Sequence, residues 1–101
     1  MWLFKNRSFV SIVQNRDDPE TLLVRARVAG HIQQAFPEAK VFTDPNADYL
    51  YRAFIGRKAV AQAVAASIED IDYDNFKDSV DDDQLHVAYM KVWSTMEKLQ
   101  A

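Results

Sequence analysis

The chain has 101 residues, of which 49 % are hydrophobic and 27 % charged, and these values are typical of one globular domain with a single core. It contains no cysteine, which excludes disulfide bonds and cysteine-ligated zinc. No apolar run approaches the roughly 20 residues that span a bilayer, and the N-terminal residues do not resemble a signal peptide. We therefore expect a cytoplasmic protein without a membrane partner.

Charge is unevenly distributed along the chain, although the net charge is only −3. Residues 1–68 carry nine Lys and Arg against six Asp and Glu, whereas residues 69–101 carry three against nine. Such an asymmetry is typical either of a surface that binds a partner or of one well-solvated loop and helix.

The first third of the chain predicts strands joined by a polar turn. Residues 2–4 are a short edge strand or a packed N-terminal arm. Residues 9–14 are rich in β-branched residues, which favour strands. Residues 15–20 contain Asn, Asp and Pro, which favour a turn, and residues 21–28 complete a hairpin.

Residues 21–28 are the element around which we expect the sheet to form. Leu22, Val24 and Val28 occupy one set of alternating positions, and Arg25 and Arg27 occupy the other. This period of two predicts a strand with one buried face. The Asp-Pro pair upstream leaves an alternative open, because it could also cap a helix that runs on to residue 36.

The remaining two thirds of the chain contain both helical and strand patterns. Residues 29–36 have apolar residues at helical spacing, whereas residues 40–43 and 49–55 have strand composition. Residues 57–71 and 84–99 carry continuous helical stripes, and Asp82 or Asp83 can cap the second helix.

The expected fold is therefore α+β, with a four-stranded, mainly antiparallel sheet in the order ββαββα and an additional C-terminal helix. Residues 1–101 form one domain, and the helices pack on one face of the sheet.

Several segments of the chain carry a resemblance to a family of small bacterial proteins of unknown function. The segments are FVSIV at 9–13, LLVRAR at 22–27, ADYLYRA at 47–53, IDYDNFKD at 71–78 and VW at 92–93. The resemblance covers nearly the whole chain, and it implies a bacterial origin. It brings no activity, ligand or catalytic residue.

An acidic loop at residues 70–81 is a candidate cation site. Its carboxylates occupy positions 1, 3, 5, 9 and 12, the spacing of oxygen ligands in a calcium loop. These residues are Asp70, Asp72, Asp74, Asp78 and Asp81. Lys77 within the loop and the overlap with helix 57–71 oppose this interpretation, and a solvated connector is the alternative. The loop is also the place where a hydrolytic site would be sought.

Two further surfaces are candidates for partner binding. Arg25, Arg27 and Arg52 share a sheet face with aromatic residues if the strands are as predicted, a combination that binds anionic ligands or nucleic acid. Tyr89 and Trp93 belong to an apolar stripe on the C-terminal helix, which we expect to be covered by the sheet, by another protein or by a second copy.

Signatures of catalysis are missing from the sequence. There is no Gly-x-Ser-x-Gly motif, Gly30 and Gly56 are isolated, and His31 and His86 lie in separate predicted helices. We therefore expect no catalytic residue and no cofactor. The expected function is a non-catalytic binding or protein-interaction module, whose partner is another protein or itself. Nucleic acid is the less favoured partner.

Overall fold

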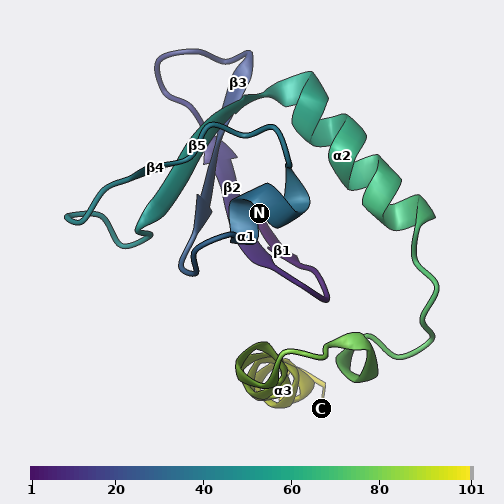
Figure 1. Ribbon diagram of the computed structural model, residues 1–101. Helices are drawn as coiled ribbons and strands as arrows, with labels where there is room; N and C mark the ends of the chain where they lie inside the picture. The colour runs from purple at the N-terminus through teal and green to yellow at the C-terminus, as the bar shows by residue number, and fades with distance from the viewer. Residues whose placement is uncertain (101) are drawn as a thin grey trace.

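An antiparallel sheet of five strands forms the centre of the computed structural model, which describes residues 1–100 (Figure 1). The strands follow the order β1-β2-β3-β5-β4 across the sheet. They are β1 (Trp2–Phe4), β2 (Phe9–Gln14), β3 (Thr21–Ala26), β4 (Phe42–Thr43) and β5 (Tyr51–Gly56). The helices are α1 (His31–Ala35), α2 (Arg57–Glu69) and α3 (Asp83–Glu97), with a short 3-10 helix η1 (Lys77–Ser79) between the last two.

The α+β class and the antiparallel sheet are confirmed, but the prediction of four strands is wrong. The fifth strand is β1, which pairs with β2 through Leu3 opposite Val10 and Phe4 opposite Phe9. Leu3 packs against the core in this register, and this burial favours a paired strand over a loose arm. Of the three helices only α2 and α3 are long, because α1 spans five residues.

The strand predicted for residues 21–28 is confirmed over Thr21–Ala26, and the helical alternative is wrong. β3 is the middle strand: Val24 lies opposite Ile12 of β2 on one side and Ala53 of β5 on the other. Pairing on both sides satisfies the backbone N–H and C=O groups of β3 within the sheet, which favours the strand over a helix here. Helix α1 begins only after Gly30. Gly30 has a φ of 89°, a left-handed conformation that favours glycine.

One face of the sheet carries the core and is covered by α1 and α2. Strands β2, β3 and β5 contribute Val10, Ile12, Val24, Ala26 and Ala53. The helices and the residue after α1 contribute Ile32, Ala35, Phe36 and Val60. Because side chains alternate along each strand, the residues between these positions project from the opposite face.

Helix α3 lies apart from the other helices, beyond the end of the β1–β2 hairpin (Figure 1). The side chain of Asp82, one of the two predicted caps, accepts a hydrogen bond from the Leu85 amide at 2.8 Å. However, α3 packs mainly against η1 and reaches the sheet only at its β1 edge, where Tyr89 contacts Phe4. The prediction that the helices pack on one face of the sheet therefore fails for α3. Across residues 1–100, no helix combines the length and apolar character needed to cross a bilayer.

The central position of β3 predicts a large difference between two valines of similar sequence context. Val24 is fully buried and Val28, just beyond the strand, is half exposed. Val24→Ala should lower the free energy of unfolding by about 2–3 kcal/mol, because it removes buried methyl groups and leaves a cavity. Val28→Ala, the matched control, should change it by less than about 0.5 kcal/mol. Urea denaturation of both variants measures the difference, and equal losses would contradict the register.

Candidate functional site

The face of the sheet opposite α1 and α2 has no helix layer over most of its area, and we call it the open face. Two neighbouring rows of side chains run across the strands there. One row contains Trp2, Ser11, Arg25, Arg52 and Phe42, and the next contains Val13, Leu23 and Phe54. Two of the three predicted arginines therefore lie on one face, as the period of two indicated.

Arg25 and Arg52 are directly opposite each other on β3 and β5. Like charges at such a position repel, and the structure turns each guanidinium towards neutral oxygen atoms. Nη2 of Arg25 donates to the hydroxyl of Ser11 at 2.7 Å, and Nη1 of Arg52 donates to the carbonyl oxygen of Tyr49 at 3.3 Å. These bonds hold both side chains in place without neutralising their charge.

Tyr49, which lies just before β5, contacts two of the arginines through its ring. Its ring is buried, and the Cζ atoms of Arg25 and Arg27 lie 4.6 Å and 4.2 Å from the ring centroid. Arg27, which lies just beyond β3, also donates from Nη1 to the carbonyl oxygen of Asp48 at 2.9 Å. Cation–π contacts of this kind stabilise a guanidinium and fix its plane. The tyrosine thus brings Arg27 to the same site as the two sheet arginines.

The positive charge of this cluster is almost uncompensated. Among residues 1–100 the one ion pair joins Arg52 to Asp48, with 4.0 Å between nitrogen and oxygen. The Asp48 side chain is 67 % exposed, so water screens the contact and it contributes little stability. Nε of Arg25 is buried without a hydrogen-bond partner, so an anion can reach this side chain only through its terminal nitrogens. The charge of the three arginines is therefore left without a strong internal counter-ion.

Aromatic rings border the arginines on the open face. Phe42 and Phe54 stack with 5.7 Å between their centroids, yet they remain 42 % and 54 % exposed. Trp2, at the other end of the row, is also exposed. Large apolar side chains in contact with water next to weakly compensated arginines are typical of a binding surface.

Tyr89, a predicted partner residue, is buried and anchors α3 to the β1–β2 loop. Its hydroxyl is 2.9 Å and 3.0 Å from the carbonyl oxygens of Lys5 and Ser8, and donates its proton to this pair. Its ring packs edge-on against Phe4 and stacks on Phe76 at 5.3 Å and 5.5 Å. Burial, and secondarily the charge of Asp82, raises the pKa of Tyr89 to about 12.

Trp93, the other predicted residue on α3, belongs to a stripe that the chain does not cover. We call Val92, Trp93, Met96 and Leu99 the α3 stripe. Trp93, Met96 and Leu99 are 47 %, 57 % and 77 % exposed. Lys77 places Nζ 4.9 Å from the centre of the Trp93 ring and shields one part of it. Tyr89 therefore anchors the first half of α3, and the second half presents an apolar surface to water.

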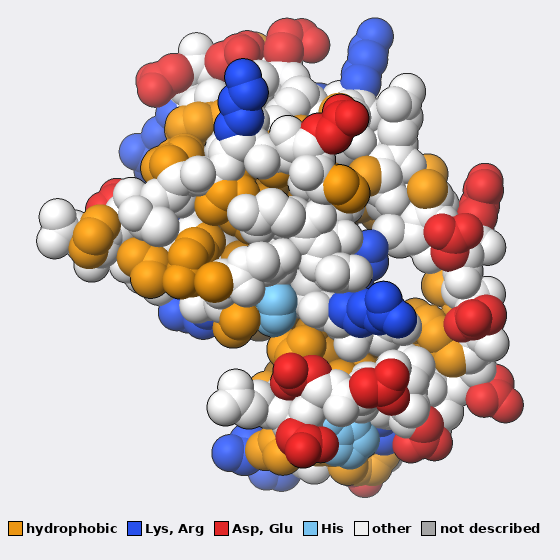
Figure 2. All heavy atoms as spheres, viewed as in Figure 1, with side chains coloured by type: hydrophobic (Ala, Val, Ile, Leu, Met, Phe, Trp, Pro, Cys, Tyr) orange, Lys and Arg blue, Asp and Glu red, His pale blue; other side chains and the backbone are white. Residues whose placement is uncertain are grey.

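Residues 69–83, which we call the acidic segment, connect α2 to α3 and carry eight carboxylates. They are Glu69, Asp70, Asp72, Asp74, Asp78, Asp81, Asp82 and Asp83, and all are exposed. Figure 2 shows acidic side chains along this connection and over the lower part of the molecule. Within residues 1–100 no three side chains of metal-binding type come close enough to hold an ion, so the fold does not gather the five predicted calcium ligands.

Both histidines contact the backbone. Nδ1 of His31 accepts a hydrogen bond from the Phe9 amide at 3.2 Å, and Nδ1 of His86 lies 3.1 Å from the carbonyl oxygen of Lys77. His31 thereby ties α1 to β2, and His86 ties α3 to η1. These roles are structural, and sequence spacing gave no indication of them.

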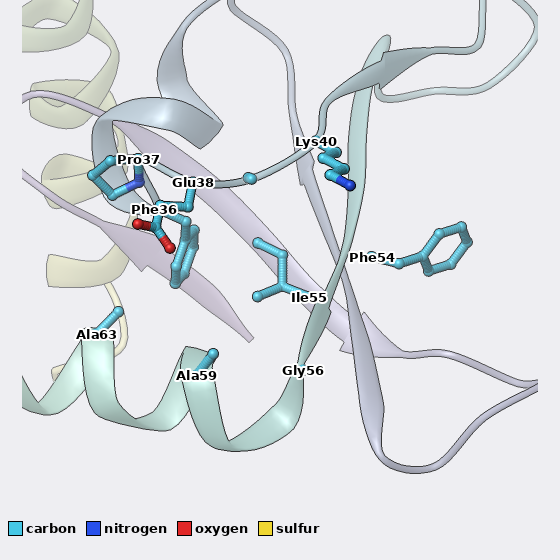
Figure 3. Close-up of a pocket in the computed structure, with 10 residues that line it drawn as sticks. Phe36, Pro37, Glu38, Lys40, Phe54, Ile55, Gly56, Ala59 and Ala63 are labelled. Carbon is cyan, nitrogen blue, oxygen red and sulfur yellow. The ribbon is translucent and has the colours of Figure 1, made fainter.

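A hollow of about 590 Å³ lies between α2, β5 and the segment after α1. Figure 3 shows Ile55 pointing into it, whereas Phe54 points to the other side of β5. The charged residues that line it are Glu38 and Lys40, and small or apolar side chains form most of the rest. The hollow lacks the converging polar groups that fix a ligand, and we assign no ligand to it.

Comparisons with protein-family models, with curated proteins and with solved structures found no match for this chain. The resemblance to small bacterial proteins therefore stays a prediction, and the candidate sites are the open face and the α3 stripe as the geometry describes them.

The raised pKa of Tyr89 predicts a loss of stability at high pH. A tyrosine in the unfolded chain titrates near pH 10, whereas Tyr89 keeps its proton up to about pH 12 in the folded chain. Its contribution is therefore complete below pH 10 and is lost as the pH rises towards 12, by up to about 2–3 kcal/mol. Denaturation at several pH values should show this fall in the wild type. Tyr89→Phe should show a smaller fall, and equal slopes would contradict the anchoring role.

Proposed function

We propose that the protein is a non-catalytic protein-interaction module whose open face, together with Arg27, binds an acidic and apolar segment of a protein partner. The observation that carries this proposal is the group of three arginines that share one surface with a single weak carboxylate contact at 4.0 Å. A carboxylate that approaches this surface gains charge-assisted hydrogen bonds and displaces no strong internal partner.

The arginine side chains are held in place before a partner binds, which favours tight binding. Arg25 and Arg27 rest against Tyr49, and Arg25 is also fixed by its bond to Ser11. Because these contacts limit side-chain motion before binding, the entropy lost on binding is reduced. Arginine and aromatic residues also dominate the binding energy of protein interfaces, and both are present here.

Apolar area beside the arginines favours a protein over a nucleic acid. Phe54, Leu23 and Val13 form a row that suits aliphatic and aromatic side chains of a partner. The exposed rings of Phe42 and Phe54 stack on each other, so they are not separate platforms for bases. The net charge of −3 also opposes a polyphosphate backbone at long range.

The proposal is tested with a synthetic helical peptide of Glu, Leu and Trp, and with a matched peptide in which Gln replaces Glu. Titration of labelled protein, followed by amide NMR shifts, should show saturable changes on β3 and β5 with the acidic peptide. Arg52→Gln and Arg27→Gln should each weaken binding about tenfold, which corresponds to about 1.4 kcal/mol. The Gln peptide should bind less tightly than the acidic one.

Arg16→Gln is the control, because Arg16 is exposed in the turn between β2 and β3 and lies away from the cluster. This variant should bind the acidic peptide like the wild type. Oligothymidine is titrated in parallel. Tighter binding of oligothymidine than of the acidic peptide, or unchanged affinity in both arginine variants, would overturn the proposal.

A further inference from the structure

We infer that the acidic, apolar segment bound by the open face belongs to a second copy of this chain: its α3 stripe and acidic segment. Two copies bind each other reciprocally, so that the α3 stripe and acidic segment of each copy dock on the open face of the other. This inference rests on the proposed function and names the partner of the same surface.

The surface area of the single chain is larger than that of a compact monomer of the same mass. A compact monomer of 11.6 kDa exposes about 5,800 Å². The chain exposes 7368 Å², about 1,500 Å² more. Its radius of gyration is 14.4 Å, against about 13 Å for a compact domain of this length. A standard interface buries about 800 Å² on each partner, so the excess area is large enough for such an interface.

The anchor at Tyr89 explains why the stripe does not cover the chain's own sheet. The hydroxyl of Tyr89 is bonded to the backbone of the β1–β2 loop, and its ring is packed against Phe4 and Phe76. Moving α3 across its own open face would break these contacts. Held in this way, α3 leaves Trp93, Met96 and Leu99 in water. Burial of such side chains is favourable, and a second copy supplies the surface that buries them.

Charge complementarity points to the same pair of surfaces. The acidic segment has eight exposed carboxylates, and within residues 1–100 none of them lies in an ion pair. The open face has the arginine cluster, whose one contact with a carboxylate is weak. Opposite charges across an interface align the partners and speed their encounter. Pairing two α3 stripes with each other would instead bring two acidic segments together.

A reciprocal exchange also closes the assembly. If copy one donates α3 to copy two and receives α3 in return, the pair has twofold symmetry and no donor or acceptor surface is left free. A one-way contact would leave both surfaces available and build a chain of copies. The inferred assembly is therefore a dimer with two identical sheet–helix contacts.

The inference is tested with one variant on each surface. Phe54→Glu places a carboxylate on the open face, and Met96→Lys places a cation on the α3 stripe; both residues are more than half exposed. Sedimentation velocity over a hundredfold concentration range should show a dimer for the wild type. Either variant alone should weaken the dimer at least tenfold. Val87→Lys, on the other side of α3, and Ala61→Glu, exposed on α2, are the controls and should dimerise normally.

Mixing the two variants gives the decisive result. One contact in the mixed pair joins the unaltered helix of Phe54→Glu to the unaltered face of Met96→Lys, and the other joins the new lysine to the new glutamate. The mixture should therefore form dimers where neither variant does. Phe42→Glu and Leu99→Lys repeat the test at two further exposed positions, so that misfolding of one variant does not decide it.

Each of the other outcomes overturns the inference. A wild type that stays monomeric at all concentrations removes the second copy as the partner. If Met96→Lys weakens the dimer and Phe54→Glu does not, the dimer forms through contact between two α3 helices, and the open face takes no part in it. The proposed function is judged separately, by the acidic peptide and the monomeric Met96→Lys variant, whose open face is unaltered. If the Met96→Lys variant binds the acidic peptide and the wild type forms no dimer, the proposed function stands and only the second copy as partner is refuted.

Discussion

The alternation of side chains along β3 is the constraint on which the rest of the structure depends. β3 is paired on both sides, so its residues point either towards α1 and α2 or towards the open face. Burying Val24 and Ala26 fixes Arg25 on the other face, opposite Arg52 of β5. A shift of β3 by one residue would turn Arg25 towards the core and expose Val24 and Ala26 on the open face. Core stability and the charge of the binding surface are thus consequences of one register.

Attachment of α3 at one end divides the molecule into a sheet with two helices and a separate helical arm (Figure 1). Tyr89 supplies the fixed point, because its hydroxyl satisfies two loop carbonyl groups and its ring completes an aromatic cluster. The arm is therefore placed with defined geometry, and the α3 stripe stays available for a partner. Its apolar area and the acidic segment beside it complement the open face in both polarity and charge.

The candidate site could be predicted in part. Parity along two strands was sufficient to place Arg25 and Arg52 on one face. The same parity assigns Tyr49 to the covered face with Tyr51 and Ala53, yet its ring contacts Arg25 and Arg27. This reversal arises because β5 begins only at Tyr51, so Tyr49 is in the preceding turn and no longer follows the alternation. Phe42 was missed because β4 has only two residues, too few to show a period.

Most of the local structure was determined by the sequence alone. Hydrophobic period, turn residues and the Asp82 cap predicted the central strand, the hairpin and both long helices to within a few residues, since these depend on neighbours in the chain. Tertiary structure decided the pairing of β1 as a fifth strand and the position of α3. An apolar stripe indicates that a helix needs a covering surface, but it does not specify which one. Here the contacts of Tyr89 hold α3 beyond the hairpin, and bonds between residues more than 80 positions apart leave no trace in local periodicity.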